Sequence, residues 1–385
     1  MSESAPPANR ASALVSELPH PEDRTRVSSG PVGRPPPDSY RTVAEIATGR
    51  EPEGVAVDPR RHQAFVACAR SDAVSVVDLV GGVVVADVPV GREPMDIVFD
   101  EATGRIFTAD LLGESVSVID GSTLGVIASV PVGLYPSGLA LDVGRRRLYC
   151  GCALSATVAV VDLDALEVVA SVEAEPGAGA IAVDSVRSRV YCANFLAGSV
   201  TVIDAEEHRG LTDVVVGAAP CALAVDSVRD ELYVANSFAD TVTSVSLESA
   251  LVTGTMRVDR TPVGAAVARD GNRLYISNRG AGTVSVLGLD DRAEWARIPV
   301  GEGPGGCTVD RLTGHLLVAN AGAGSLTVVE DLMAERPPAM PATPPHELLG
   351  RPLPPFELPD MRTGLARTNL EWAERKYILN FFASW

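Results

Sequence analysis

Lysine is almost absent from this chain, because among its 32 basic residues only Lys376 is a lysine, a bias typical of a high-GC genome. The basic residues are outnumbered by 50 acidic ones, so the net charge is −18. Nucleic acids and anionic membranes repel such a surface, which argues against both as partners. A run of about 18 apolar residues is also missing, so we expect no transmembrane span.

Three further shortages bear on compartment and fold class. The first forty residues lack the apolar region of a secretory signal, which favours a cytoplasmic location. Six cysteines are too few for a disulfide scaffold in 385 residues, so we expect free thiols. Aromatic residues make up only 5% of a chain with 35 glycines, a composition that favours short strands and tight turns over helical bundles.

A period of 42 residues runs through most of the chain. One series consists of Asp58, Asp100, Asp142, Asp184, Asp226 and Asp310, with Ala268 in the one gap. Seven residues after each position stand Phe65, Phe107, Tyr149, Tyr191, Tyr233, Tyr275 and Leu317. A third series, Asp78, Asp120, Asp162, Asp204, Ser246, Gly288 and Glu330, keeps the same spacing. The common period predicts a repeat architecture.

Each period contains four short apolar runs. In the second repeat these are Met95–Asp100, Ile106–Asp110, Val116–Asp120 and Val126–Val132. These four runs are short and rich in β-branched residues, which is typical of strands. They are separated by Gly, Pro, Asp or Ser, which is typical of turns. Four antiparallel strands in 42 residues predict one blade of a propeller.

The number of blades follows from length. Residues 37–330 span 294 positions, which is seven periods. The strand around Val43–Ala47 matches the fourth strand of later repeats, whereas the last repeat ends after its third strand, Leu326–Glu330. The sequence therefore predicts an all-β, seven-bladed β-propeller over residues 40–331, closed by its N-terminal strand.

The repeats resemble the YVTN-type β-propeller repeat. The residues that carry the resemblance are Tyr233-Val234-Ala235-Asn236 with its counterparts, the Val-Gly-x-x-Pro of Val90–Pro94, and Val202-Ile203-Asp204. The resemblance implies a fold rather than a function, since propellers serve as binding, scaffold, lyase, lactonase and redox proteins. Many proteins with this repeat are extracytoplasmic, so a misassigned start codon remains an alternative to the cytoplasmic location.

The two ends differ from the repeats. Residues 1–39 contain eight prolines and little to bury, which predicts a disordered leader. Residues 332–347 are proline-rich and predict a stiff linker. The segment 348–385 resembles the opening of a redoxin domain of the TlpA-like and peroxiredoxin group, with Gly350-x-x-x-Pro354-x-Phe356-x-Leu358 and Asn380-Phe381-Phe382-Ala383-Ser384-Trp385. It would be a truncated, N-terminal thioredoxin-like fragment.

In the redoxin family the next residue is the nucleophilic cysteine of Cys-x-x-Cys, so no catalytic residue is expected within this chain. Three explanations for its end at Trp385 are left open: a cut at a domain boundary or an incomplete gene, a degenerate natural stop, or a UGA codon read as selenocysteine. A thiolate or selenolate at that place would be the nucleophile.

Polar residues that could bind a ligand gather on the first three blades. The loop before the first strand of a blade and the loop between its second and third strands should share one face. In the later blades the positions compared carry no charge: Ala218, Ala219, Gly303, Gly305, Asn194, Asn236 and Asn320. The candidate binding residues in blades one to three are Arg50, Glu51, Glu53, Cys68, Arg70, Arg92, Glu93, Asp96, Asp110 and Tyr135. The alternative is that these charges form inter-blade ion pairs and a solvated surface.

Metal and cofactor sites are not expected. Equivalent positions on neighbouring blades lie about 10 Å apart, too far to share a zinc ion at bond lengths of about 2.0–2.3 Å. The chain also lacks a glycine-rich phosphate loop placed before a helix.

Three functional hypotheses follow. The first is a monomeric binding or scaffold propeller, joined to a redoxin-type oxidoreductase or peroxidase module, that recruits a protein or small-molecule partner. The second is a propeller enzyme of the lyase or lactonase type, using the acidic residues of blades one to three. The third is a non-catalytic interaction platform.

Overall fold

The computed structural model describes residues 36, 39–268, 270–333, 357–359 and 366–368. They fall in two units, Met1–Arg336 and Pro337–Trp385. In the second unit, β29 (Glu357–Pro359) pairs antiparallel with β30 (Ala366–Thr368). The predicted leader, linker and redoxin-like segment lie outside the described residues, except for these two strands and for residues 36, 39, 332 and 333.

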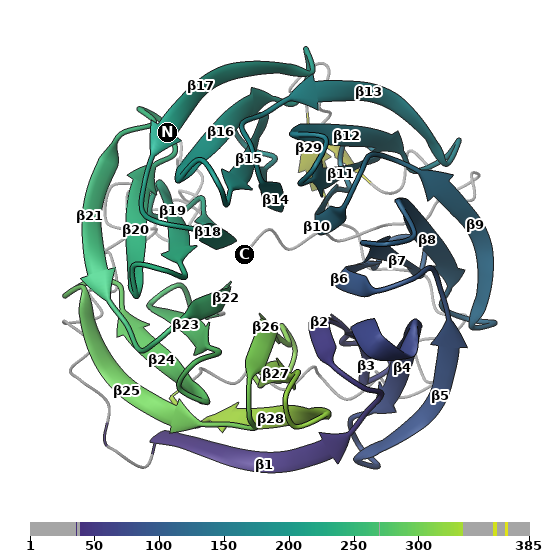
Figure 1. Cartoon of the computed structure of the whole chain (residues 1–385), viewed down its shortest axis with the longest axis vertical. Coiled ribbons are helices and arrows are strands. Elements are labelled where there is room, and N and C mark those ends of the chain that lie inside the picture. The colour runs from purple at the N-terminus through teal and green to yellow at the C-terminus, as the bar shows by residue number, and fades with distance from the viewer. Residues whose placement is uncertain (1–35, 37–38, 269, 334–356, 360–365, 369–385) are drawn as a thin grey trace, which may run out of the picture. The chain divides into compact units, whose positions relative to one another are not determined.

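The first unit is a ring of seven four-stranded antiparallel sheets (Figure 1). Each sheet is one blade, and its first strand lies nearest the axis of the ring. The predicted all-β, seven-bladed propeller is confirmed.

The strands have the following bounds. Blade 1 contains β2 (Pro52–Asp58), β3 (Gln63–Cys68), β4 (Ala73–Asp78) and β5 (Val83–Pro89), with a 3-10 turn, η3 (Ala69–Ser71), after β3. Blade 2 contains β6 (Pro94–Asp100), β7 (Arg105–Asp110), β8 (Ser115–Asp120) and β9 (Gly125–Pro131). Blade 3 contains β10 (Pro136–Asp142), β11 (Arg147–Cys152), β12 (Thr157–Asp162) and β13 (Glu167–Glu173). Blade 4 contains β14 (Ala178–Asp184), β15 (Arg189–Asn194), β16 (Ser199–Asp204) and β17 (Arg209–Val215).

Blade 5 contains β18 (Pro220–Asp226), β19 (Glu231–Asn236), β20 (Thr241–Ser246) and β21 (Val252–Arg257). Blade 6 contains β22 (Pro262–Val267), β23 (Arg273–Asn278), β24 (Thr283–Gly288) and β25 (Ala293–Pro299). Blade 7 contains β26 (Pro304–Val309), β27 (Leu316–Asn320), β28 (Ser325–Asp331) and, from the other end of the propeller sequence, β1 (Tyr40–Ala47).

The N-terminal strand closes the ring as predicted. β1 pairs antiparallel with β28, from Tyr40 opposite Asp331 to Ala47 opposite Ser325. Ile46 on this strand is buried in one cluster with Val55 of blade 1 and Leu326 of blade 7. The propeller therefore joins its first and last strands through both backbone pairing and a shared core, which gives blade 7 its fourth strand and closes the ring.

The aspartates that mark the period have a local structural cause. In blade 1, Oδ1 of Asp58 accepts hydrogen bonds from the backbone N–H groups of Arg60 (3.0 Å) and Arg61 (3.2 Å). The equivalent carboxylates, from Asp100 to Asp310, accept the same kind of bond in their blades. These are Asx turns, which reverse the chain between the first and second strands.

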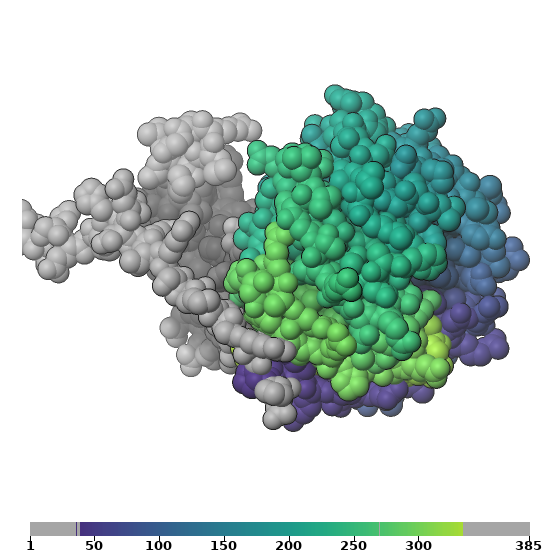
Figure 2. Space-filling model, turned by 60° about the vertical axis from the view of Figure 1, so that its left-hand side comes forward, coloured from purple at the N-terminus to yellow at the C-terminus, as the bar shows by residue number. Residues whose placement is uncertain are grey.

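The core lies between successive blades. Phe65 of blade 1 packs with Ile97 and Ile106 of blade 2, and Phe107 of blade 2 packs with Leu148 of blade 3. These residues are almost completely buried. Figure 2 shows the result from outside the ring, where neighbouring blades adjoin continuously. The periodic aromatic series is therefore inter-blade packing.

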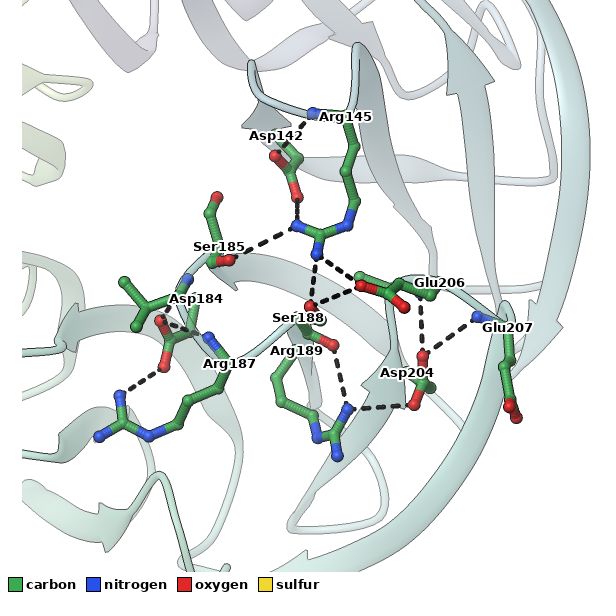
Figure 3. Close-up of polar contacts among 12 residues, drawn as sticks. Asp142, Arg145, Asp184, Ser185, Arg187, Ser188, Arg189, Asp204, Glu206 and Glu207 are labelled. Atoms are coloured by element: carbon green, nitrogen blue, oxygen red, sulfur yellow. Dashed lines mark hydrogen bonds and ion pairs between the residues drawn. The ribbon is translucent and has the colours of Figure 1, made fainter. Parts of the chain in front are cut away.

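Arginines join the blades on the face that carries the Asx turns (Figure 3). Arg145 of blade 3 pairs with Asp142 (3.0 Å) and crosses to Glu206 of blade 4 (3.0 Å). Its repeat equivalent Arg187 pairs with Asp184 (2.9 Å) and crosses to Asp230 of blade 5 (2.8 Å). The polar surface there is largely committed to holding neighbouring blades together.

Candidate functional site

The opposite face of the ring is built from two loops in each blade. The N–H of Ala69, after β3, donates to the carbonyl of Glu51, before β2, at 2.9 Å. The same bond recurs in all seven blades and ends with Ala321 to Gly303 at 2.9 Å. The two loops therefore share a face, as the sequence predicts, and the side chains on them vary while the backbone stays the same.

A hollow of about 840 Å³ opens on this face. Blades 1 and 2 supply most of its wall, with contributions from blade 7 and from Arg279 of blade 6. Four arginines and four acidic residues face it. It is lined by Arg50, Glu51, Glu53, Ala69, Arg70, Asp72, Arg92, Glu93, Leu112, Arg279, Gly303, Ala321 and Gly322, which we call the charged hollow. Six of the ten predicted binding residues belong to it.

Arg70 connects the acidic side chains of two blades. Its Nε donates to Glu51 at 2.7 Å, and its Nη1 lies 3.8 Å from a carboxylate oxygen of Glu93. The hydrogen bond to Glu51 raises the pKa of Arg70 above its usual value. The backbone N–H of Glu93 in turn donates to Asp72 at 2.9 Å, so the loops of blades 1 and 2 are fixed to each other.

Arg50 and Arg92 are repeat equivalents with matching contacts. The guanidinium of Arg50 donates to the carbonyl of Arg70 at 2.8 Å, and that of Arg92 donates to the carbonyl of Leu112 at 2.6 Å. Among the described residues neither guanidinium forms an ion pair. Since a guanidinium has five N–H donors, both keep donors and an unneutralised positive charge for a ligand.

Glu53 and Arg279 form an ion pair between blades that are not neighbours. Gly305, on the inner strand β26 of blade 7, lies between them: a Cβ there would come within 3.1 Å of Oε2 of Glu53 and 3.3 Å of Nη2 of Arg279. Burial raises the pKa of Glu53, and the charge of Arg279 opposes that rise.

Cys68 and Asp110 do not face the surface, which corrects the sequence-based expectation. Each ends the second strand of its blade and is completely buried. Burial raises the pKa of both side chains. The carboxylate of Asp110 accepts hydrogen bonds from the hydroxyls of Thr108 (2.8 Å), Ser115 (3.4 Å) and Ser117 (2.6 Å). Asn236, Asn278 and Asn320 occupy the same position in later blades and donate to Ser and Thr hydroxyls, so the position is a buried structural link.

Asp96 also lies outside the charged hollow. Its Oδ1 accepts from the N–H of Ile97 and its Oδ2 from the N–H of Leu139 in blade 3, each at 2.8 Å. Burial raises its pKa to about 6. Asp96 thus links two inner strands, and it is not brought together with Glu53 as a pair of carboxyl groups.

Tyr135, the last candidate, lies on the same face in blade 3, where it is 37% exposed, but it does not line the hollow. The sequence reasoning missed Asp72 and Arg279. Arg279 could have been found as the one arginine at a repeat position held elsewhere by Ala, Leu, Phe or Ser. Gly303 and Gly322 also form part of the wall of the hollow.

Neither a metal centre nor a membrane helix was found in the described part of the chain. No group of three or more His, Cys, Asp or Glu side chains there is arranged to hold a metal ion. No helix among the same residues combines the length and the apolar character that a membrane crossing requires.

Comparison with known proteins agrees with the fold. Residues 41–227 match the model of the YNCE-like β-propeller family. A solved structure of hydrazine synthase from Kuenenia stuttgartiensis superposes with a TM-score of 0.68 at 19% identity, covering 74% of this chain and 96% of that chain. At this identity the likeness concerns the fold alone. Among curated proteins no match was found.

Proposed function

We propose that the propeller is a recognition module that binds an acidic segment of a protein partner at the charged hollow. The observation that carries the proposal is the contrast among the four arginines. Arg70 and Arg279 are neutralised by Glu51 and Glu53, whereas Arg50 and Arg92 donate only to backbone carbonyls. Carboxylates are ligands that match such guanidinium groups.

The backbone at Glu51 and Glu93 does not call for a glutamate. Both residues are in the left-handed region, with φ of 53° and 51°, and the same repeat position in the other blades is filled by Tyr135, Gly177, Ala219, Thr261 and Gly303, all with positive φ. A side chain in this region costs about 1 kcal/mol relative to glycine. The fold therefore does not require glutamates there, and their effect is to fix Arg70 between two blades.

We also propose that the partner is a substrate of redoxin-type thiol chemistry. The support is the motif in residues 348–385, from Gly350 to Trp385. The test is to read the codon after that of Trp385 and to assay the full gene product for dithiothreitol-dependent reduction of insulin disulfides. A cysteine or selenocysteine codon with activity supports this proposal, and an open frame without either residue, or an inactive product, contradicts it.

The recognition proposal is tested with a library of random twelve-residue peptides displayed on phage. The full chain is the bait, and enriched peptides are measured by fluorescence anisotropy. We expect them to contain acidic residues and to lose at least tenfold in affinity for Arg50→Gln/Arg92→Gln. Arg60→Gln, an exposed arginine of the opposite face, is the matched control and should bind as the unaltered protein does. Equal binding by the Arg50/Arg92 variant would overturn the proposal.

A further inference from the structure

A second surface lies beside the charged hollow on the same face. Blades 3, 4 and 5 present large apolar side chains there: Leu134, Tyr135, Leu154, Phe195, Leu196 and Phe238, which we call the apolar arc. The most exposed members are Leu154 (60%), Leu196 (71%) and Phe238 (73%). Contiguous exposed apolar side chains on a folded domain mark interaction sites.

The arc is confined to one sector of the ring. Leu154, Leu196 and Phe238 occupy one repeat position, whose other members are Arg70, Leu112, Gly280 and Gly322. Leu112 lines the charged hollow, so the apolar series continues from the hollow without interruption into blades 3 to 5. The same backbone therefore displays charge on one side of the face and apolar surface on the other.

The arc is held in place by its own contacts. The rings of Phe195 and Phe238 meet edge to face across blades 4 and 5, with centroids 5.4 Å apart. The N–H of Leu196 donates to the carbonyl of Pro176 at 3.2 Å, and the N–H of Leu154 donates to that of Leu134 at 3.2 Å. These contacts order the loops that carry the arc, so little backbone conformational entropy is lost on binding.

We infer that the apolar arc binds apolar side chains of the same protein segment whose acidic groups are held by Arg50 and Arg92. This inference rests on the proposed function and extends it to an acidic segment with neighbouring leucine or aromatic residues. Two observations support the inference. The arc is continuous with the charged hollow, and the arc itself is uncharged, whereas the guanidinium groups of Arg50 and Arg92 lie in the adjoining hollow. The net charge of −18 disfavours insertion into an anionic membrane.

The experiment uses the peptides enriched from the random library. They are measured against the full chain, Leu196→Ser/Phe238→Ser, Arg50→Gln/Arg92→Gln, and Val228→Ser, a control on the opposite face where Val228 is 97% exposed. Thermal midpoints establish that each variant is folded. We expect enriched peptides to combine leucine or aromatic residues with acidic ones and to lose at least tenfold in affinity for the Leu196/Phe238 variant, with no change for Val228→Ser.

The outcomes separate the two proposals. Loss of binding with the arginine variant alone overturns the apolar arc as a binding surface and leaves the recognition proposal standing. Loss with neither variant overturns both. Sedimentation of the protein with phosphatidylcholine vesicles, abolished in Leu196→Ser/Phe238→Ser, would assign the arc to a lipid surface and overturn the inference.

Discussion

Arg279 of blade 6 and Glu53 of blade 1 meet over Gly305 of blade 7, so one ion pair spans three blades of the ring. Glu53 is 8% exposed and Arg279 is 38% exposed. The pair is part of the wall of the charged hollow and also lies near the closure of the ring. It therefore connects the stability of the closed ring with the shape of the proposed binding surface.

A double-mutant cycle should detect this pair. We expect Glu53→Gln and Arg279→Met to be coupled by about 1–2 kcal/mol in the free energy of unfolding, because one partner is nearly buried and the other partly solvated. Urea denaturation of the four proteins measures the coupling. Strictly additive effects would mean that the pair contributes nothing to the closed ring.

Gly305 should not tolerate a side chain. A Cβ at this position would lie 2.8 Å from the backbone oxygen of Glu53. We expect Gly305→Ala to destabilise the protein by about 1–3 kcal/mol through this overlap. Gly144→Ala is the matched control, since its Cβ would meet only an ordinary contact, 3.5 Å from Asp142. Equal melting temperatures of the two variants would contradict the close approach.

Asp96 should make stability depend on pH. Its pKa is raised by burial to about 6, above the value of 3.8 that it has when unfolded. Below about pH 4 the carboxyl is protonated in both states, and its contribution to stability is lost as the pH rises towards 6. We expect the unfolding free energy of the unaltered protein to fall relative to that of Asp96→Asn by up to about 3 kcal/mol between pH 4 and 7. A constant difference over that range would show that Asp96 titrates normally.

The fold was predictable because its determinants are local and repeated. Asp58 and its equivalents close turns within three residues, and the aromatic series starting at Phe65 fills the same inter-blade space each time. The closure by β1 was also predictable, because the repeats begin with one extra strand and the last repeat lacks its fourth strand. Such features repeat every 42 residues, so the sequence displays each of them several times.

The site was only partly predictable, because it depends on what the loops cover. Cys68 and Asp110 looked like surface positions, but the preceding loops pack on them: a Cβ at Gly49 would lie 2.8 Å from the Cβ of Cys68. Arg279 was missed for another reason. It stands 226 residues from Glu53, and only the closure of the ring brings the two together.

The arginines of the turn-bearing face should stabilise the ring. Arg145→Met removes the partner of Asp142, whose carboxylate is inaccessible to solvent, and the link to Glu206 (Figure 3). We expect a loss of about 2 kcal/mol in the free energy of unfolding. Arg209→Met, which breaks only an exposed pair with Glu207, should change little. Chemical denaturation compares the two, and equal losses would show that the inter-blade link is not the cause.

The position of a bound partner tests the central claim most directly. A photoreactive benzoylphenylalanine is placed at Leu112, in the charged hollow, or at Val228, on the opposite face, and each protein is irradiated with a peptide enriched from the random library. The account predicts a covalent adduct at Leu112 and none at Val228. An adduct at Val228 with none at Leu112 would contradict it and move the binding surface to the other side of the ring.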